Sequence, residues 1–365
     1  MEETIWFYGI CRFTGLMSMG RWLIRKAGSR VIILNYHRAS GRNLRSHLLY
    51  YKRHYRIMHL EGALKELFMP DKYQEKRQDK RTILVLTFDD GFKDNYTNAF
   101  ALAKELQVPF TVFLIPGYIG SRRRFWWLEG DHLVNHAQVQ EILFEKRTYN
   151  LKLLADRTEL SQAIYRRLHN ARTVSDREAF LNDLRTALAV SPEYIKDNAG
   201  ALTWEEIYEM QESGWVSFGA HTMHHPVLAE LTETLELEDE INQSRLILQQ
   251  KLGKPIDIFA YPLGKMKHIG EEAVKTVEKA GYSWAVTTEP GINTPKSHPH
   301  LLRRIVINAE SNWVVPAAFT AGIGLIFLPF FAYGKALLSK GVWFYSFLIT
   351  SNKQLMEGTK SSERC

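Results

Sequence analysis

The stretch Ile83-Leu84-Val85-Leu86-Thr87-Phe88-Asp89-Asp90-Gly91 decides the fold of this chain. A short apolar run that ends in turn-forming residues is typical of a buried strand. Two adjacent carboxylates follow the run, and Gly91 allows a backbone turn through which both can reach one cavity. Two close carboxylates repel each other unless a cation or a proton neutralises one of them, so the pair indicates a cation site. The alternative is a helix N-cap, with Asp94 at the start of the next helical segment.

Similar apolar runs recur along the chain and alternate with amphipathic segments such as 95–106, 235–252 and 270–280. This alternation predicts an α/β protein with a largely parallel sheet, specifically a distorted (β/α) barrel with about seven strands. The pattern leaves open an incomplete barrel or an open doubly wound sheet. The predicted strands are Val31–Tyr36, Ile83–Phe88, Phe110–Ile115, Val216–Ala220, Ile256–Tyr261, Trp284–Thr288 and Arg304–Ile307.

The barrel is expected to span residues 31–310. Residues 121–200 contain no strand-like run and are predicted to be a helical insertion, either a lid over the sheet or a packing elaboration. Residues 1–30 form an N-terminal extension in which 5–23 is expected to be one amphipathic helix, packed on the domain or lying on a membrane. Residues 311–365 form an apolar C-terminal extension.

The C-terminal extension has no charged residue from Trp313 to Gly334, which is long enough for a membrane-spanning helix. Pro316 and Pro329 favour a buried or interfacial segment instead, and the two interpretations stay open. Because the N-terminus is a poor secretory signal, we expect a cytoplasmic or membrane-associated protein.

The chain of 365 residues has a net charge of +7 and a pI near 9.2, which suits an anionic partner such as a membrane surface or a glycan. The basic residues are scattered and accompany no nucleic-acid motif, so no nucleic acid is expected. The cluster 122–127 (RRRFWW) is interpreted as a solvated basic turn beside an aromatic core anchor, and the alternative is a contact for a membrane surface or a glycan. Cys11 and Cys365 are in no ligand spacing, which argues against a disulfide framework or a thiolate metal site.

Further polar motifs follow three other predicted strands: Tyr36-His37, His221-Thr222-Met223-His224-His225 and Tyr261-Pro262-Leu263-Gly264. The carboxyl ends of parallel barrel strands open onto one face, so these motifs are expected to converge with the acid pair. One carboxylate and two histidines are a suitable ligand set for catalytic zinc, and cobalt, nickel or iron could use the same site. We assign Asp90 as ligand and Asp89 as general base.

Two histidines of the second motif, His221 and His225, are four residues apart, so on a helical turn both imidazoles would face one ion. His224, three residues after His221, is the competing partner of His221. The third motif, from Tyr261 to Gly264, is by itself only a turn signal, but beside a metal its backbone N–H groups could stabilise an oxyanion.

With these residues in place, the chain resembles the polysaccharide deacetylase superfamily, the NodB-homology or carbohydrate esterase family 4 group. Residues 87–91 match its TFDDG signature, and residues 221–225 match its H-[ST]-x-x-x-H signature. Residues 259–264 (FAYPLG) look like its third motif with Leu263 in place of the usual Tyr, and residues 35–38 (NYHR) resemble the opening found in exopolysaccharide-linked members.

The resemblance implies a metal-dependent hydrolase that removes N-acetyl groups from an amino-sugar polysaccharide or its lipid-linked precursor. It implies that the metal ligands are Asp90, His221 and His225, that the base is Asp89, and that the N–H of Leu263 helps form an oxyanion hole. The substrate-binding residues that it implies are Tyr261, Pro262 and Gly264.

The chain departs from the family pattern in two places. The arginine that many members carry before the third motif's proline is Ala260 here, for which Arg303 or Arg304 could substitute, unless they pair with surface acids. No late-histidine motif supplies the general acid, although His298 and His300 are nearby. The alternative functions are a deformylase of a lipid-linked amino sugar and a catalytically idle carbohydrate-binding barrel.

Overall fold

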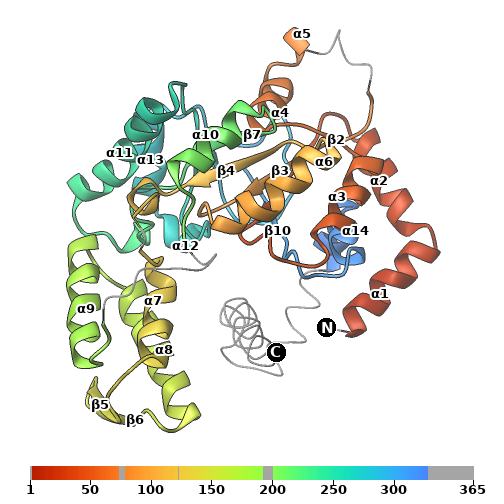
Figure 1. The fold of residues 1–365 in the computed structure, drawn as a ribbon. Helices are drawn as coiled ribbons and strands as arrows, with labels where there is room; N and C mark the ends of the chain where they lie inside the picture. Colours follow the sequence, from red (N-terminus) through yellow and green to blue (C-terminus); the bar gives the residue numbers. More distant parts are fainter. Residues whose placement is uncertain (1, 74–78, 122, 192–199, 328–365) are drawn as a thin grey trace.

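A computed structural model describes residues 2–73, 79–121, 123–191 and 200–327 as a curled, mostly parallel sheet surrounded by helices (Figure 1). The strand order is β10-β1-β3-β4-β7-β8-β9, and the short β2 pairs beside the first half of β3. The sheet confirms the predicted seven strands and adds β2, whose two residues are too few for a sequence signal. The strands are β1 (Val31–Tyr36), β2 (Arg56–Ile57), β3 (Ile83–Phe88), β4 (Phe110–Leu114), β7 (Val216–Ala220), β8 (Ile258–Ala260), β9 (Trp284–Val286) and β10 (Ile305–Val306).

The two edges of the sheet are joined by one short segment, which makes the fold a distorted barrel. Leu302 forms a parallel bridge with Val286 of β9, and three residues later Ile305 pairs with Leu34 of β1. A single stretch of chain therefore contacts both edges.

The central strands β1 and β3 are apolar throughout because both of their faces are buried. On β3, Leu84 and Leu86 face the outer core beneath the helices, whereas Ile83 and Val85 face an inner core. Helix α4 (Leu60–Phe68) contributes to this inner core with its buried leucines. Side chains alternate between the two faces of a strand, so Asp89, one residue beyond the end of β3, lies on the inner side.

Helices cover the outer face of the sheet. Four of them match the three predicted segments: η2 and α6 together cover 95–106, α11 covers 235–252 and α13 covers most of 270–280. Helix α11 ends at Gly253, which has a left-handed φ of 63°. The helices of the barrel are α3 (Leu44–His54), α4 (Leu60–Phe68), α5 (Pro70–Tyr73), η2 (Asn95–Phe100), α6 (Ala101–Leu106), η3 (Pro116–Tyr118), α10 (Trp204–Glu212), η4 (Leu228–Glu230), α11 (Thr234–Leu252), α12 (Met266–Ile269) and α13 (Glu271–Lys279).

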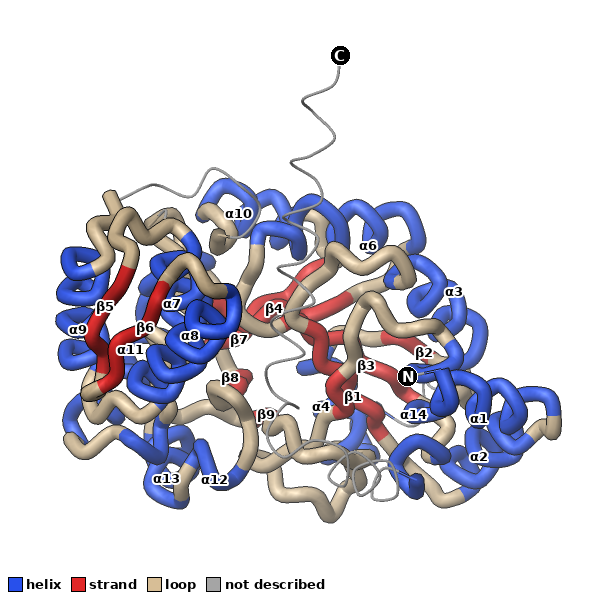
Figure 2. The backbone as a smooth tube through the Cα atoms, turned by 90° about the horizontal axis from the view of Figure 1, so that it is seen from below, coloured by secondary structure: helices blue, strands red, loops and turns tan. Residues whose placement is uncertain are grey.

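The insertion forms a separate lobe at one end of the molecule (Figures 1 and 2). It contains α7 (Trp126–Asn135), α8 (Leu154–His169) and α9 (Val174–Ala187), together with an antiparallel hairpin of β5 (Glu141–Phe144) and β6 (Arg147–Asn150). The insertion is thus largely helical, and the hairpin is an element that the sequence prediction did not include. The hairpin is mostly exposed, so its strands lack an apolar run, and its turn is made by Glu145 and Lys146 with φ of 47° and 68°.

The lobe has its own apolar core, and this core continues into the barrel. Phe125 and Trp126 are fully buried, as the aromatic-anchor interpretation predicted. The same cluster includes Phe92, which follows β3, and Ile115 and Tyr118, which follow β4. The lobe therefore packs on the loops at the carboxyl ends of these strands.

The N-terminal extension is two helices, α1 (Glu2–Phe13) and α2 (Leu16–Lys26), and not the single helix predicted. The break is at Gly15, whose φ of 77° ends the helical path. Both helices pack on α14 (Val314–Thr320), which buries Val314 and Ala317 between them and the barrel. Among the described helices, none combines the length and apolarity that crossing a bilayer requires. The rest of the predicted C-terminal extension, residues 328–365, lies outside the described residues.

Candidate metal centre

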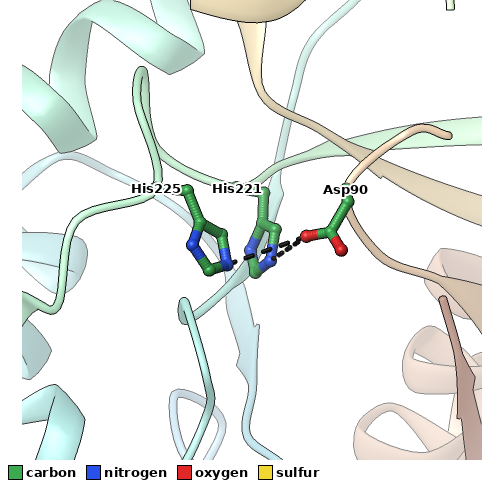
Figure 3. Close-up of side chains that lie close together, drawn as sticks. All are labelled: Asp90, His221 and His225. Carbon is green, nitrogen blue, oxygen red and sulfur yellow. Dashed lines mark ion pairs between the residues drawn. The ribbon is translucent and has the colours of Figure 1, made fainter. Parts of the chain in front are cut away.

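Asp90, His221 and His225 converge at the carboxyl edge of the sheet (Figure 3). The Asp90 Oδ1 atom lies 3.5 Å from His221 Nε2 and 3.7 Å from His225 Nε2. All three side chains are buried, and their candidate ligand atoms lie within 4.8 Å of one another. Ligand atoms of a tetrahedral ion with bonds of roughly 2.0 Å are about 3.3 Å apart, so the spacing suits a divalent metal ion.

The acid pair does not cap a helix. Asp90 has a φ of 73° and Gly91 one of 69°, so the chain turns sharply before η2 begins. The N-cap of η2 is Asp94, and its side chain makes no capping bond; it accepts hydrogen bonds from Arg38 Nε and Ser40 N–H instead. The turn leaves Asp90 Oδ1 buried with no hydrogen-bond donor among the described residues. A cation would satisfy this oxygen.

The orientation of His221 exposes one nitrogen to the site. Its Nδ1 lies 2.7 Å from the carbonyl oxygen of Ala260, so this nitrogen carries the proton and donates it. The Nε2 lone pair then faces Asp90. A ligand histidine held by a backbone carbonyl in this way is the usual arrangement at metal sites.

The loop that carries the two histidines is not helical, which corrects the predicted helical turn. Thr222 and His225 have left-handed φ values of 62° and 55°, and Pro226 follows directly. The His225 N–H donates to Thr222 Oγ1 at 2.9 Å, which folds the loop back on itself. The two imidazoles still reach one point, with ring centroids 4.8 Å apart.

The insertion fixes His225 from outside the barrel. Trp126 Nε1–H donates to the carbonyl oxygen of His225 at 2.8 Å, and the Trp127 ring lies 4.5 Å from the imidazole. Arg177 of α9 donates to the neighbouring carbonyl of His224 at 3.0 Å. The lobe therefore forms one wall of the site and does more than elaborate the packing.

His224 points away from the cluster. Its Nδ1 lies 2.6 Å from Glu240 Oε1 of α11, and its N–H donates to the other oxygen of that carboxylate. The structure thus separates the competing histidine from Asp90.

Burial and neighbouring charge act differently on the two candidate ligands. Burial lowers the pKa of His225 well below its usual value, and the nearby His221 and Arg177 lower it further, so His225 is neutral. Burial also lowers the pKa of His221, but Asp90 and Asp89 outweigh it and raise the net pKa. The carboxylates thus attract positive charge to the place where His221 Nε2 and Asp90 meet.

Asp89 lies beside the cluster in a fully buried ion pair. Arg304 NH1 donates to Asp89 Oδ1 and NH2 to Oδ2, both at 2.7 Å, and Asn35 Nδ2 donates to Oδ2 at 3.1 Å. Arg304 is held in turn by the Thr287 carbonyl at 2.8 Å and by Thr87 Oγ1 at 3.1 Å. Of the two arginines proposed from the sequence, Arg304 therefore lies at Asp89.

The pair keeps Asp89 ionised. Burial raises the pKa of this carboxyl, but the charges of Arg304 and His221 more than offset it, so the net pKa lies below the usual Asp value. A carboxylate beside a candidate metal centre can accept a proton.

The third motif contributes backbone and not the tyrosine side chain. Tyr261 is fully buried in the outer core, and its hydroxyl donates to the His300 carbonyl at 3.0 Å, so a glycan cannot reach this side chain. Pro262 is also buried. Leu263 has a φ of 60°, and its N–H makes no hydrogen bond to any residue that the structure describes. Gly264 has a φ of 71°, and a Cβ there would lie 2.6 Å from the Thr288 backbone nitrogen.

The two late histidines lie at the wrong end of the sheet to serve as the acid. His300 Nε2 bonds to the carbonyl of Tyr282, before the first residue of β9, and both His298 and His300 face Glu278 of α13. The amino edge of β9 is opposite to the carboxyl edge that carries Asp90. This finding removes His298 and His300 from the site.

His37 is a site residue whose role the sequence did not reveal. Tyr36 and Phe88 are paired in register, and the Asp89 N–H donates to the Tyr36 carbonyl at 2.9 Å, so the next residue, His37, emerges beside the acid pair. A positive charge at His37 would lower the pKa of both Asp89 and His225. In the sequence, the signal for His37 was its position directly after the first predicted strand.

Comparison with known proteins gives a family match over much of the chain. A family model described as polysaccharide deacetylase matches residues 76–177 and 181–285. YxkH of Bacillus subtilis (strain 168), a protein named as a polysaccharide deacetylase, is 22% identical over 293 residues, which cover 79% of this chain and 75% of that protein. A poly-beta-1,6-N-acetyl-D-glucosamine N-deacetylase of Staphylococcus aureus (strain MRSA252) is 20% identical over 306 residues, which cover 77% and 79%.

A solved structure shares the fold. IcaB from Ammonifex degensii aligns with a TM-score of 0.52 and 19% identity, over 80% of this chain and 98% of that one. The acid pair, both candidate histidine ligands and the third motif lie inside the ranges that the family model matches, whereas His37 and Arg304 lie outside them.

Proposed function

Because the chain belongs to the polysaccharide deacetylase family, we propose that it hydrolyses the N-acetyl groups of an amino-sugar polysaccharide, or of its lipid-linked precursor, with a divalent metal ion as cofactor. The observation that carries this proposal is the buried cluster of Asp90, His221 and His225 with the ionised Asp89 beside it. The named activity of the Staphylococcus aureus relative supports an N-acetylglucosamine polymer as the substrate class.

Asp90, His221 and His225 would hold the ion. One carboxylate and two imidazoles with spacing that fits bonds of about 2 Å suit zinc first, and cobalt, nickel or iron could use the same ligands. When bound, such an ion polarises the amide carbonyl and lowers the pKa of a coordinated water.

Asp89 would accept the proton of the attacking water. Its two oxygens are oriented by Arg304 and Asn35, and the guanidinium keeps the carboxylate charged in the resting protein. Oδ2 accepts two of these hydrogen bonds and Oδ1 accepts one, so Oδ1 retains a lone pair for the proton. The ion pair with Arg304 thus lowers the basicity of Asp89 but fixes the orientation and the charge of its carboxylate.

The N–H of Leu263 would donate to the oxygen that becomes negative when water adds to the amide carbon. Backbone donors fixed in advance stabilise such an oxyanion because they need no reorganisation during the reaction. Two hydrogen bonds from Thr288, one to Leu263 O and one to Gly264 O, both 2.8 Å, hold the turn that presents this group.

His37 would protonate the leaving amine. Departure of the amine needs an acid, and His37 is the histidine that register places beside Asp89. Because it follows β1 directly, its backbone is fixed by the same pairing that fixes Asp89.

Acetate release tests the proposal directly. The purified full chain is treated with a chelator, reloaded with Zn²⁺ and incubated with poly-β-1,6-N-acetylglucosamine and with chitooligosaccharides. We expect metal-dependent acetate release, and Asp89→Asn should lower kcat by roughly 10²- to 10⁴-fold because it removes the base. His221→Ala should abolish metal binding, and the matched control His298→Ala should change neither quantity.

The alternatives give different outcomes. Activity of Asp89→Asn and His221→Ala equal to the parent would refute the site. Tight metal binding without turnover of any N-acetylated glycan would indicate an idle carbohydrate-binding barrel. Release of formate from an N-formyl amino sugar without release of acetate would indicate a deformylase.

A further inference from the structure

Helices α1 and α2 have apolar side chains on two sides, and only one side is covered. Their inner side buries Tyr8, Cys11 and Met17 against α14. Seven large apolar residues on the other side are exposed, and we call them the outer apolar face. They are Trp6 (75% exposed), Ile10 (47%), Phe13 (87%), Leu16 (40%), Met19 (52%), Trp22 (48%) and Leu23 (51%).

The spacing of these residues makes the face continuous. Trp6, Ile10 and Phe13 follow one another at four and three residues, which places them on one side of α1. On α2, Leu16, Met19 and Leu23 repeat this spacing at three and four residues. Exposed apolar residues elsewhere on the described chain are mostly isolated, and such residues are normal on a protein surface.

Every charged residue from Thr4 to Arg30, the stretch that carries the face, is basic. From Thr4 to Arg30 the sequence contains no Asp or Glu, and Arg12, Arg25 and Lys26 are exposed. The Lys26 ammonium lies 6.0 Å from the ring of Trp22. Aromatic and aliphatic side chains with basic residues at their edge are the pattern of helices that lie in a membrane interface.

Helices α1 and α2, which carry the face, lie at the end of the molecule opposite the insertion (Figures 1 and 2). Ile326 is 67% exposed at the last described turn, beyond α14, which packs on α1 and α2. The sequence then continues as Leu328-Pro329-Phe330-Phe331 and includes a second apolar run, 342–349 (VWFYSFLI). The sequence thus stays apolar in places past the last described residue.

We propose that the outer apolar face docks the protein on an anionic lipid bilayer, with α1 and α2 lying in the interface and their basic residues at the headgroups. The charge favours this occupant over two others. In a symmetric dimer the same basic residues would face each other and repel. Residues 328–365 carry five basic and two acidic side chains, so they do not complement the face either.

Vesicle binding by the full chain tests the proposal. Co-sedimentation is measured with phosphatidylcholine vesicles that contain, or lack, phosphatidylglycerol. We expect binding to the anionic vesicles that weakens as salt is raised. Replacement of three exposed residues (Trp6→Ser, Phe13→Ser, Trp22→Ser) should weaken it on the order of 100-fold, because their insertion supplies most of the apolar contact. Arg25→Glu with Lys26→Glu should weaken it by about tenfold or more.

The matched control removes exposed apolar residues from elsewhere on the surface: Leu143→Ser, Leu154→Ser and Leu235→Ser, which are 71%, 71% and 75% exposed in the parent. It should bind vesicles as the parent does. Circular dichroism and acetate release from a soluble oligosaccharide should be unchanged in all variants, since none touches the barrel site. Absence of binding to anionic vesicles, or equal binding by the triple variant of the outer apolar face, would overturn the proposal. Concentration-dependent dimers that this triple variant abolishes, without vesicle binding, would assign the face to a second copy.

Discussion

Replacement of Arg304 by Met tests how the site holds its base. Arg304 and Asp89 are both buried, and the guanidinium donates to both carboxylate oxygens at 2.7 Å. Met fills a similar volume but leaves Asp89 without its counter-ion. Removal of one partner of a buried ion pair costs about 3–5 kcal/mol because the other charge stays buried and unpaired. We expect a loss of this order in the free energy of unfolding of Arg304→Met at neutral pH.

The loss should depend on pH. The pKa of Asp89 is below its unfolded value in the parent, because Arg304 and His221 outweigh burial. The pair therefore stabilises the fold above the unfolded pKa, and this contribution is lost as pH falls through the folded pKa. In Arg304→Met burial acts with less opposition and the pKa rises. The stability deficit of the variant should thus be largest at neutral pH and shrink in acid.

A double-mutant cycle measures the pair itself. Urea unfolding of Arg304→Met, of Asp89→Asn and of the double variant gives the coupling energy. The double variant should be more stable than Arg304→Met alone, because Asn35 and Thr87 can accommodate a neutral side chain better than an unpaired charge. Arg303→Met, at the exposed neighbouring position, is the control and should change little. Additive losses in the cycle, or a deficit that does not change with pH, would refute the assignment.

Three further outcomes follow from the geometry. Trp126→Phe keeps an aromatic side chain, although a smaller one, but removes the N–H that holds the His225 carbonyl. The Kd for Zn²⁺ in a calorimetric titration should therefore rise about tenfold or more, and an unchanged Kd would contradict the role of the insertion. Gly264→Ala should destabilise the fold by about 1–3 kcal/mol in urea and lower kcat, because a Cβ would lie 2.6 Å from the Thr288 nitrogen at a φ of 71°. Burial lowers the pKa of His47 to about 4, so the unfolded chain takes up a proton below about pH 6.5 that the folded chain does not. Stability should therefore fall between about pH 6.5 and 4, and His47→Gln should remove about 3 kcal/mol of that fall; an equal slope in both proteins would count against this explanation.

The sequence predicted the strands and the convergence of the motifs for a simple reason. Strands that are buried on both faces must be apolar throughout, so 31–36 and 83–88 could be bounded to the residue. A polar residue placed directly after such a strand can only emerge at the carboxyl edge. Both statements depend on local sequence and on parallel topology, which the alternation of strand and helix signals reveals.

What the sequence could not reveal depends on contacts between remote segments. The ion pair joins two residues 215 positions apart, and no pattern distinguishes Arg304 from Arg303 until β10 is placed beside β1. The conformation of the histidine loop was predicted wrongly because a spacing of four suits a helix and a folded-back loop equally. His225 is oriented by Trp126, which belongs to an insertion with no sequence relation to the motif.

Backbone strain gives the last argument that these separate elements form one functional unit. Eight non-glycine residues of the described chain have positive φ, and four of them are Asp90, Thr222, His225 and Leu263. Such conformations cost of order 1–3 kcal/mol each and persist only where surrounding contacts enforce them. Here the contacts come from different elements: Thr222 Oγ1 on the His225 N–H, Trp126 on the His225 carbonyl, and Thr288 on the Leu263 carbonyl. The strained residues include two candidate metal ligands, Asp90 and His225, and Leu263, whose N–H is the candidate donor to the oxyanion. A barrel that only bound a glycan would not need to hold these residues in unfavourable conformations around one carboxylate. The distribution of backbone strain therefore favours catalysis over the idle barrel.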